Sequence, residues 1–391
     1  MLADAIEGDG RVLIIGDFDA DGATSSAMAV NVLRQMGLRD VAYLVPNRFE
    51  FGYGLTPEIV ELAAAQMPDL IVTVDNGISS IEGVAAARAM GISVLVTDHH
   101  LPGEQLPSAE VIVNPNQPGC AFPSKALAGV GVMFYVLTAL RKYLRDNNRL
   151  PDPEPNLGAL LDLVALGTVA DVVPLDHNNR IFVEQGIRRI RKGEARPGIL
   201  ALLQVAGRDY TEISATDLGF VVGPRLNAAG RLDDMSIGIA CLLADSRDEA
   251  LRLARELDNF NRERRTIEKD MKAQAQDLLA SMSLDIDGLP WGLALFDQDW
   301  HQGVIGILAA RIREQTHRPT IAFAPDDDGE HLKGSARSIP GLHIRDALAV
   351  VDAKNPGLMK KYGGHAMAAG MTIARDDLER FSNAFDQAVR D

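Results

Sequence analysis

The sequence has few cysteines and no long hydrophobic run. Cys120 and Cys241 are the only cysteines among 391 residues, so a disulfide framework is excluded and a reducing compartment is expected. No run of about 18 apolar residues occurs, which argues against a membrane-spanning helix. The acidic N-terminal segment MLADAIEGDG lacks the apolar stretch of a signal peptide. We therefore expect a cytoplasmic protein without a membrane partner.

Positive charge and aromatic side chains are also scarce. The formal net charge is −15, which argues against a general nucleic-acid binder but leaves open a local basic groove. Aromatic residues make up 5 % of the chain, so no long platform for stacking nucleic-acid bases is visible. The sequence contains no CxxC pair, no P-loop and no Gly-x-Ser-x-Gly motif, so it gives no indication of structural zinc, a P-loop nucleotide site or a serine nucleophile.

The first part of the chain alternates short apolar runs with helical patterns. Nearly continuous apolar runs are typical of strands that are covered on both faces of a parallel sheet. Helical patterns at 24–36, 57–65 and 81–90 separate the runs, as in an open α/β sheet. The five predicted strands are RVLIIGD at 11–17, VAYLVP at 41–46, LIVTVDNG at 70–77, SVLVTDHH at 93–100 and VIVNP at 111–115.

Later segments predict a second domain and a connection to it. Residues 245–282 carry many charges and neither glycine nor proline, which predicts one or two long helices, either as a connector or as a solvated surface. Residues 283–391 have the pattern of a smaller α/β domain. The predicted fold class is therefore α/β. A parallel-sheet domain at 1–244, with its core sheet at about 11–115, is joined by the helical connector to the accessory domain.

The stretch GDFDADG is similar to the first half of a calcium-binding EF-hand loop. Asp17, Asp19, Asp21 and Gly22 occupy the matching positions. An EF-hand also needs a bidentate glutamate at loop position twelve and a helix that enters the loop. The residue at that position is Met28, and the preceding segment is a predicted strand. The calcium-loop interpretation is therefore rejected.

Acidic and imidazole side chains follow several of the predicted strands. Asp75 ends LIVTVD, and Asp98, His99 and His100 end the next strand, while Asp171 follows a predicted helix. The carboxyl ends of parallel strands meet at one edge of the sheet, where open α/β folds bind ligands. We therefore expect these groups to converge with the acidic stretch at 17–21.

Each of these residues also has a purely structural explanation. Asp19 or Asp21 caps a helix in one such interpretation, and Asp75 before Asn76 and Gly77 is a typical turn residue. The combination of three carboxylates, a fourth on the next strand and an Asp-His-His triplet favours a metal site. Mixed carboxylate and imidazole ligands suit Mn²⁺, Fe²⁺, Co²⁺ or Zn²⁺, whereas oxygen ligands alone favour Mg²⁺ or Ca²⁺. Two ions about 3.5–4 Å apart would serve phosphoester or phosphoanhydride hydrolysis.

Four motifs give the sequence a family resemblance. DFDADG, VTVDNG, VTDHH and ALGTVADVVPL occur in this order, and together they resemble the motifs of the DHH phosphoesterase superfamily. WHQGVIGILAARI, GSARSIPGLHIRDAL and YGGHAMAAG resemble the accessory domain of that superfamily, and GPRLNAAGR is similar to the RecJ exonuclease family within it. The resemblance extends from about residue 11 to about residue 374.

The resemblance implies an activity, cofactors and residue roles. RecJ-like enzymes degrade single-stranded DNA from the 5′ end to mononucleotides in repair and recombination, with Mn²⁺ or Mg²⁺. Carried onto this chain, it implies two divalent ions, most simply Mn²⁺, with Asp75 bridging. Asp17 matches a ligand or a group that supports one, and His100 matches a residue that faces the scissile phosphate. The metal ligands that the resemblance implies are Asp19, Asp21, Asp75, His99 and Asp171.

The resemblance also implies contacts to DNA outside the metal ligands. Arg48 and Tyr53 match a region that engages the 5′ end, although a surface arginine and a packed tyrosine are the alternative. GPRLNAAGR combines cations with flexible backbone, and later glycine-rich turns offer N–H groups to phosphates, with a structural turn as the alternative. The residues concerned are Arg225, Asn227 and Arg231, followed by Ser335, Arg337, Gly364 and His365.

Members of the family usually begin earlier and continue into an OB-fold. This sequence ends after FSNAFDQAVRD, so the expectation is a catalytic core without that barrel. A single-strand-binding protein or a helicase is the expected kind of protein partner. Two other functions stay open: a DHH phosphodiesterase acting on short oligoribonucleotides or cyclic dinucleotides, and a scaffold protein that has lost its metals.

Overall fold

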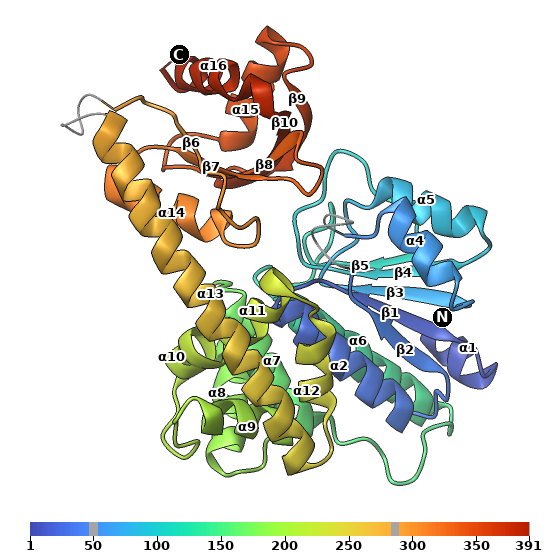
Figure 1. The fold of residues 1–391 in the computed structure, drawn as a ribbon. Coiled ribbons are helices and arrows are strands. Elements are labelled where there is room, and N and C mark those ends of the chain that lie inside the picture. The colour runs from blue at the N-terminus through green and yellow to red at the C-terminus, as the bar shows by residue number, and fades with distance from the viewer. Residues whose placement is uncertain (47–53, 283–288, 391) are drawn as a thin grey trace. The chain divides into compact units, whose positions relative to one another are not determined.

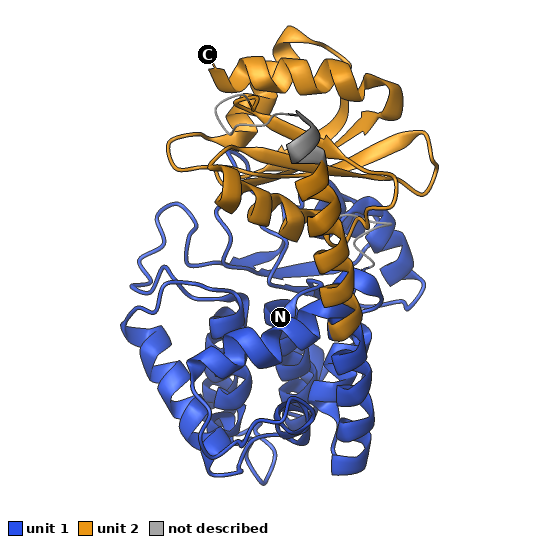
Figure 2. Ribbon diagram, turned by 60° about the vertical axis from the view of Figure 1, so that its left-hand side comes forward, with its two compact units in different colours: residues 1–261 blue, residues 262–391 orange. Residues whose placement is uncertain are grey.

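The chain forms two compact units. A computed structural model describes residues 1–46, 54–282 and 289–390, and the units comprise residues 1–261 and 262–391 (Figure 2). The boundary falls inside one continuous helix, α13 (Arg247–Met282), which spans the predicted connector and confirms its helical character. The predicted three-part division at 244 and 282 treats this helix as a segment of its own, whereas the two units divide it. That division stays a prediction.

The first unit contains a five-stranded parallel sheet with the strand order β2-β1-β3-β4-β5 (Figure 1). Each strand lies inside one of the five predicted apolar runs, so the prediction of a parallel sheet is confirmed. The strands are β1 (Val12–Gly16), β2 (Val41–Leu44), β3 (Leu70–Val74), β4 (Ser93–Thr97) and β5 (Val111–Val113).

Helices cover both faces of this sheet, which explains why its strands are apolar at consecutive positions. Ile14 and Val72 face a core shared with α2 (Ala20–Gln35) and α6 (Gly129–Asp146). Leu13 and Ile71, one residue earlier on the same strands, face a core shared with helices α4 and α5 on the other side. Figure 1 shows the two helix layers. The other helices described in this half are α1 (Leu2–Glu7), α4 (Pro57–Ala64) and α5 (Ile81–Ala89).

A helical subdomain completes the first unit. Its central helix, α7, is almost entirely apolar and packs against α2 and α8, so it holds the subdomain to the sheet. Asp171 is the C-terminal capping residue of α7. The elements are η1 (Leu157–Leu160), α7 (Leu161–Ala170), α8 (His177–Arg191), α9 (Pro197–Val205), α10 (Ala215–Asp217), η2 (Leu218–Val222), α11 (Gly223–Leu232) and α12 (Ser236–Leu243).

The second unit contains a mixed sheet with the order β6-β7-β8-β10-β9, in which β6 and β7 are parallel and the other pairs antiparallel. Met271 and Ala275 of α13 pack with α14 on one core, and α15 and α16 pack on a second core. This confirms the predicted second α/β domain. Its elements are β6 (Leu293–Phe296), α14 (Ile305–Thr316), β7 (Thr320–Pro325), β8 (His331–Arg337), α15 (Ile344–Lys354), β9 (Met359–Gly364), β10 (Ala368–Ala374), η4 (Arg375–Asp377) and α16 (Leu378–Arg390).

Across the described parts of the chain, none of the helices combines the length and the hydropathy that a bilayer crossing needs.

Candidate metal centre

The predicted ligands lie at a topological switch point of the parallel sheet. From β1 the chain passes to β2 on one side, whereas β3 leads to β4 on the other. Open α/β sheets bind ligands outside the carboxyl ends of strands at such a point. The acidic loop 17–21 follows β1, Asp75 follows β3, and His99 and His100 follow β4. The α7 terminus adds Asp171.

The potential ligands form three groups, and one of them, Asp75 with His99 and His100, shares a member with each of the other two. One potential ligand atom from each of Asp17, Asp19 and Asp75 lies within 4.8 Å of the others, and the same holds for Asp21, His99 and Asp171. Nε2 of His99 is 3.1 Å from Oδ1 of Asp75, 3.5 Å from Oδ2 of Asp171 and 4.0 Å from Oδ2 of Asp21. All six residues that the sequence placed at the metals therefore converge.

Asp19 has the capping role that was considered from the sequence. It is the N-cap of α2, and its Oδ1 accepts hydrogen bonds from the backbone N–H groups of Asp21 and Gly22 at 2.9 and 3.0 Å. The cap fixes the direction in which α2 leaves the loop. A carboxylate has about four acceptor sites, so capping and metal binding are compatible in this residue.

Asp21 is held by the N-terminus of α6. Its two oxygens accept hydrogen bonds from the backbone N–H groups of Gly129 and Val130 at 2.6 and 2.9 Å. The side chain is fully buried. Burial and the nearby charge of Asp19 raise the pKa of Asp21 to about 7 in spite of these hydrogen bonds. A metal ion would supply the positive charge that keeps this carboxyl group ionised.

Asp75 has an unusual backbone conformation. Its φ is +64°, in the left-handed region that few residues other than glycine, asparagine and aspartate adopt. The backbone N–H of Asp75 donates to the carbonyl of Thr97 at 3.1 Å. Nδ2 of Asn76 donates to the carbonyls of Ile15 and Val74 at 3.1 and 2.9 Å. These bonds tie the end of β3 to both neighbouring strands and hold a conformation that costs about 1–3 kcal/mol.

The charges of this cluster call for a cation. Burial and the charges of Asp21 and Asp19 raise the pKa of Asp75 well above its ordinary value. Burial, with the same two neighbours, raises the pKa of Asp171 to about 8. Burial lowers the pKa of His99 to about 4, so its imidazole is neutral at pH 7. Buried carboxylates and a neutral imidazole that share one site are the donor set of a divalent metal.

The orientation of His99 supports the same conclusion. Nε2 of His99 has no hydrogen-bond partner among the described residues. It lies within 4.0 Å of oxygens of three carboxylates, those of Asp75, Asp171 and Asp21. The residues present thus fit a divalent cation.

His100 differs from His99 in charge. Burial lowers the pKa of His100, but the hydrogen bond and the charge of Asp98 outweigh it and raise the pKa to about 9. Nδ1 of His100 is 2.7 Å from Oδ1 of Asp98, and Asp98 also accepts from the N–H of Ile78 at 2.9 Å. Asp98, which the sequence grouped with the potential ligands, thus orients His100. In the metal-free protein His100 is therefore a cationic donor, and one of its ring nitrogens also lies within 4.8 Å of potential ligand atoms of Asp75 and His99.

Two glycines that the sequence analysis missed make room for the carboxylates. A Cβ atom on Gly129 would lie 2.6 Å from Cβ and 2.7 Å from Oδ1 of Asp75. A Cβ atom on Gly167 would lie 2.3 Å from Oγ1 of Thr24 and 2.8 Å from Oδ1 of Asp21. Helices α6 and α7 therefore approach the cluster at backbone distance. A glycine within a helical pattern was the available signal.

The segment GPRLNAAGR is helix α11 rather than a flexible loop, so that expectation was wrong. Oδ1 of Asn227 accepts the N–H of Ala20 at 2.7 Å, and a Cβ on Gly230 would lie 1.9 Å from the carbonyl oxygen of Phe18. The small residues allow α11 to pack on the acidic loop. Arg225 is buried and pairs with Asp258 at 2.8 Å. Arg231 is half-buried near the end of the helix.

Two of the phosphate-binding predictions in the second unit also need correction. Ser335 and Arg337 lie on strand β8 and not in a glycine-rich turn. Buried and half-buried side chains alternate along this strand, and both residues are on the half-buried face. Nη1 of Arg337 donates to Oγ of Ser335 at 3.1 Å. Gly364, with φ +146°, and His365 do lie at the β9–β10 turn, where the N–H of His365 donates to Ala368 at 2.8 Å. Arg48 and Tyr53 lie outside the described residues.

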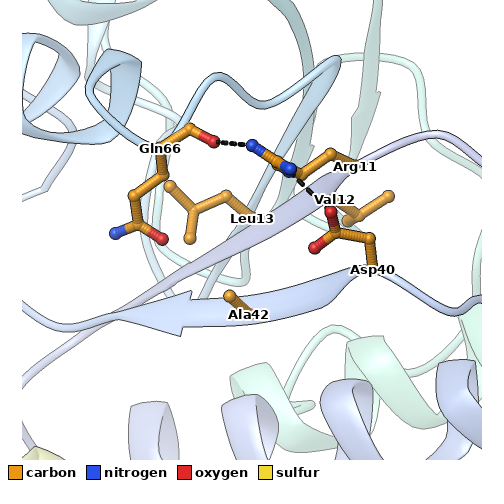
Figure 3. Close-up of a pocket in the computed structure, with 6 residues that line it drawn as sticks. All are labelled: Arg11, Val12, Leu13, Asp40, Ala42 and Gln66. Atoms are coloured by element: carbon orange, nitrogen blue, oxygen red, sulfur yellow. Dashed lines mark hydrogen bonds and ion pairs between the residues drawn. The ribbon is translucent and has the colours of Figure 1, made fainter.

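A cavity of about 240 Å³ lies at the other end of the sheet (Figure 3). Arg11, which lines it, precedes β1, whereas the acidic loop follows that strand. The Arg11 guanidinium is 2.6 Å from Oδ2 of Asp40 and donates to the carbonyl of Gln66 at 2.7 Å. No predicted site residue lines this cavity, so it is separate from the metal centre. Its lining residues are Arg11, Val12, Leu13, Asp40, Ala42 and Gln66.

The raised pKa values predict how the stability of the metal-free protein depends on pH. Asp21 and Asp171 titrate at about 7 and about 8 when folded, against about 3.9 in an unfolded chain. The folded state therefore binds more protons between these values, and this contribution to stability is lost as the pH rises from about 4 to about 8. In EDTA we expect Asp171→Asn to melt at a higher temperature than the wild type, and we expect this difference to grow as the pH rises over this range.

Thermal melts of both proteins between pH 5 and pH 9 check this prediction. A constant difference between them would contradict it. Added Mn²⁺ should reverse the trend in the wild type, because metal binding displaces the same protons and strengthens as the pH rises.

Comparisons with known proteins agree with this geometry. Residues 11–168 match the DHH family, N-terminal domain, and residues 290–391 match the DHHA1 domain. The chain is 58 % identical over 392 residues to the single-stranded-DNA-specific exonuclease RecJ of Dickeya dadantii, covering 100 % of this chain and 68 % of the relative. The corresponding protein of Escherichia coli K12 is 57 % identical, with the same coverage.

A solved structure shows the same fold. The crystal structure of exonuclease RecJ bound to manganese superposes with a TM-score of 0.83 at 33 % identity, covering 100 % of this chain and 92 % of that one. The order of motifs, the ligand set and the similarity over the whole length lead to one assignment. The chain belongs to the RecJ family of the DHH phosphoesterases.

Proposed function

We propose that the chain is a metal-dependent exonuclease that hydrolyses single-stranded DNA from the 5′ end to mononucleotides, in DNA repair and recombination. The convergence of six carboxylate and imidazole ligands at the sheet edge carries this proposal. Relatives at 57–58 % identity are named single-stranded-DNA-specific exonucleases, which supports the substrate. Solved RecJ structures contain Mn²⁺ or Mg²⁺, which supports these ions as cofactors.

Two of the three side-chain groups, those that contain carboxylates of the acidic loop, correspond to two cation positions. We assign Asp17, Asp19 and Asp75 to one ion, and Asp21, His99 and Asp171 with Asp75 to the other. When bound, such a pair lowers the pKa of a shared water and neutralises charge on the attacking and leaving oxygens. The protein holds the ligands in fixed positions through the cap at Asp19 and the α6 N–H groups on Asp21.

His100 has the properties of a phosphate-binding catalytic residue. Its ring is protonated at neutral pH and oriented by Asp98. We assign it to a non-bridging oxygen of the scissile phosphate, where a cationic donor stabilises the charge that develops in the transition state. Asn227 acts instead on the backbone of Ala20. The DNA contacts of Arg48, Tyr53, Arg225, Arg231, Ser335, Arg337, Gly364 and His365 stay predictions, as do the cytoplasmic location and a single-strand-binding protein or helicase as partner.

A product assay tests the proposed function. Incubation of the protein with Mn²⁺ and single-stranded DNA labelled at the 5′ end should release labelled mononucleotides from the first turnover, and Asp75→Asn should release none. Labelled dinucleotides and short oligoribonucleotides serve as competing substrates. Hydrolysis restricted to these short substrates would support a different phosphodiesterase, and no hydrolysis of any substrate would support a scaffold.

A further inference from the structure

The side chain of Phe220 is exposed in a part of the fold that is otherwise closely packed. It is 74 % exposed, although burial of a phenylalanine ring stabilises a protein by about 1.5–3 kcal/mol. Phe220 lies in the middle of η2, a short π-helix. The apolar side chains at its two ends, Leu218 and Val222, are fully buried. Single π turns occur frequently at functional sites. The core therefore fixes η2 and leaves this ring on the surface.

Close backbone packing joins η2 to the helix that supplies Asp171. A Cβ on Gly219 would lie 3.2 Å from Cγ1 of Val169, and a Cβ on Gly223 would lie 3.2 Å from Cβ of Ala170. Val169 and Ala170 are the last two residues of α7, directly before Asp171. The glycines on both sides of Phe220 thus hold its backbone against the segment that ends in the metal centre.

Val172 is a second exposed apolar side chain at this place. It follows Asp171 directly, is 84 % exposed and has a φ of +62°. A β-branched residue in this region is a true outlier and costs about 1–3 kcal/mol, as is typical of functional sites. Two exposed apolar side chains thus belong to this region: Phe220 in η2, whose glycines pack against the end of α7, and Val172, which follows Asp171 directly.

We propose that Phe220, with the exposed Val172, forms a stacking surface for an unpaired base of the substrate strand near the metal centre. The inference rests on the proposed function. It supplies a single stacking contact in a chain whose few aromatic residues do not form a long platform for bases. An uncharged ring suits the flat face of a base better than its phosphate, and stacking on an aromatic side chain contributes about 1–3 kcal/mol per base. Inside a duplex each base is stacked on both faces, so contact with a base beyond the terminal pair favours single strands.

A comparison of normal and abasic strands tests the proposal. Phe220→Ala should raise KM for single-stranded DNA about 5- to 150-fold, the range equivalent to 1–3 kcal/mol, and Phe220→Tyr should restore it. In the wild type, abasic sites placed in turn at the first positions from the 5′ end should include one that raises KM by the same factor. On that strand Phe220→Ala should have no further effect.

The controls separate this inference from the proposed function. Tyr210→Ala removes another exposed ring of the first unit and should leave KM unchanged. Cleavage of single strands with an unchanged KM in Phe220→Ala would overturn the stacking surface alone. An equal loss on normal and abasic strands would also overturn it, because the ring would then support the fold or contact protein. A wild type that cleaves no single-stranded DNA would overturn both proposals.

Discussion

Replacing Asp75 with asparagine is expected to abolish hydrolysis and, at the same time, to stabilise the metal-free protein. Asp75 belongs to the first ligand group and lies 3.1 Å from His99 in the second, so its loss removes several kcal/mol of transition-state stabilisation, or about 10³-fold or more in rate. In EDTA the same carboxyl group is 2 % exposed and surrounded by other acids, so a neutral side chain relieves repulsion. Asparagine also tolerates the left-handed backbone at this position.

The stability effect is measured by thermal melting in EDTA at pH 8. Each kcal/mol of relief raises the melting temperature by about 2–4 °C in a domain of this size. Asp98→Asn is the matched control, because Asp98 is also a buried aspartate next to the centre, but the hydrogen bonds from His100 and Ile78 outweigh the effect of burial and lower its pKa. That variant should melt at a lower temperature than the wild type. A lower melting temperature for Asp75→Asn in EDTA would refute the like-charge explanation.

The second large effect is expected from the smallest change, a single methyl group on Gly129. In Gly129→Ala the new Cβ would lie 2.6 Å from Cβ of Asp75, so either α6 or the carboxylate must move. Displacement of a catalytic group by about 1 Å reduces rates by about 10²-fold. We therefore expect kcat/KM to fall by at least that factor and Mn²⁺ to bind more weakly, although alanine favours a helix over glycine by about 1 kcal/mol.

Gly131→Ala provides the control on the same helix. Its Cβ would lie 3.1 Å from Cδ2 of Leu127 and 3.5 and 3.7 Å from Cβ and Cγ of the same side chain, and a side-chain methyl can move aside. Calorimetric titration with Mn²⁺ and nuclease rates should show a loss for the Gly129 variant and near-normal values for the Gly131 variant. Equal behaviour of the two variants would mean that the close approach of α6 does not position Asp75.

The sequence predicted the parts of this molecule that depend on local pattern. Strand ends are visible as apolar runs that stop at polar residues, so Asp75 and His99 could be placed on one sheet edge before the structure was known. The EF-hand interpretation failed on local grounds as well, since Met28 cannot act as the bidentate ligand.

Contacts between distant segments could not be predicted. Nothing in the sequence shows that Gly129 touches Asp75, or that Asn227 holds the backbone of Ala20, because these pairs form only when the helices pack. Arg225 illustrates the same limit, since its partner Asp258 lies on another helix. The opposite protonation of the adjacent His99 and His100 depends on burial and on the side chain of Asp98, which a motif does not encode.

The hydrogen bonds on the acidic loop have a consequence for biosynthesis. The loop and the first five strands leave the ribosome early, because synthesis proceeds from the N-terminus. The N–H groups that hold Asp21 come from Gly129 and Val130, and the acceptor that holds Ala20 comes from Asn227 in α11. Asp171 also follows later. A nascent chain that has completed only the sheet therefore lacks a formed metal centre, which requires that Asn227 has been translated and that α6, α7 and α11 have packed on the acidic loop.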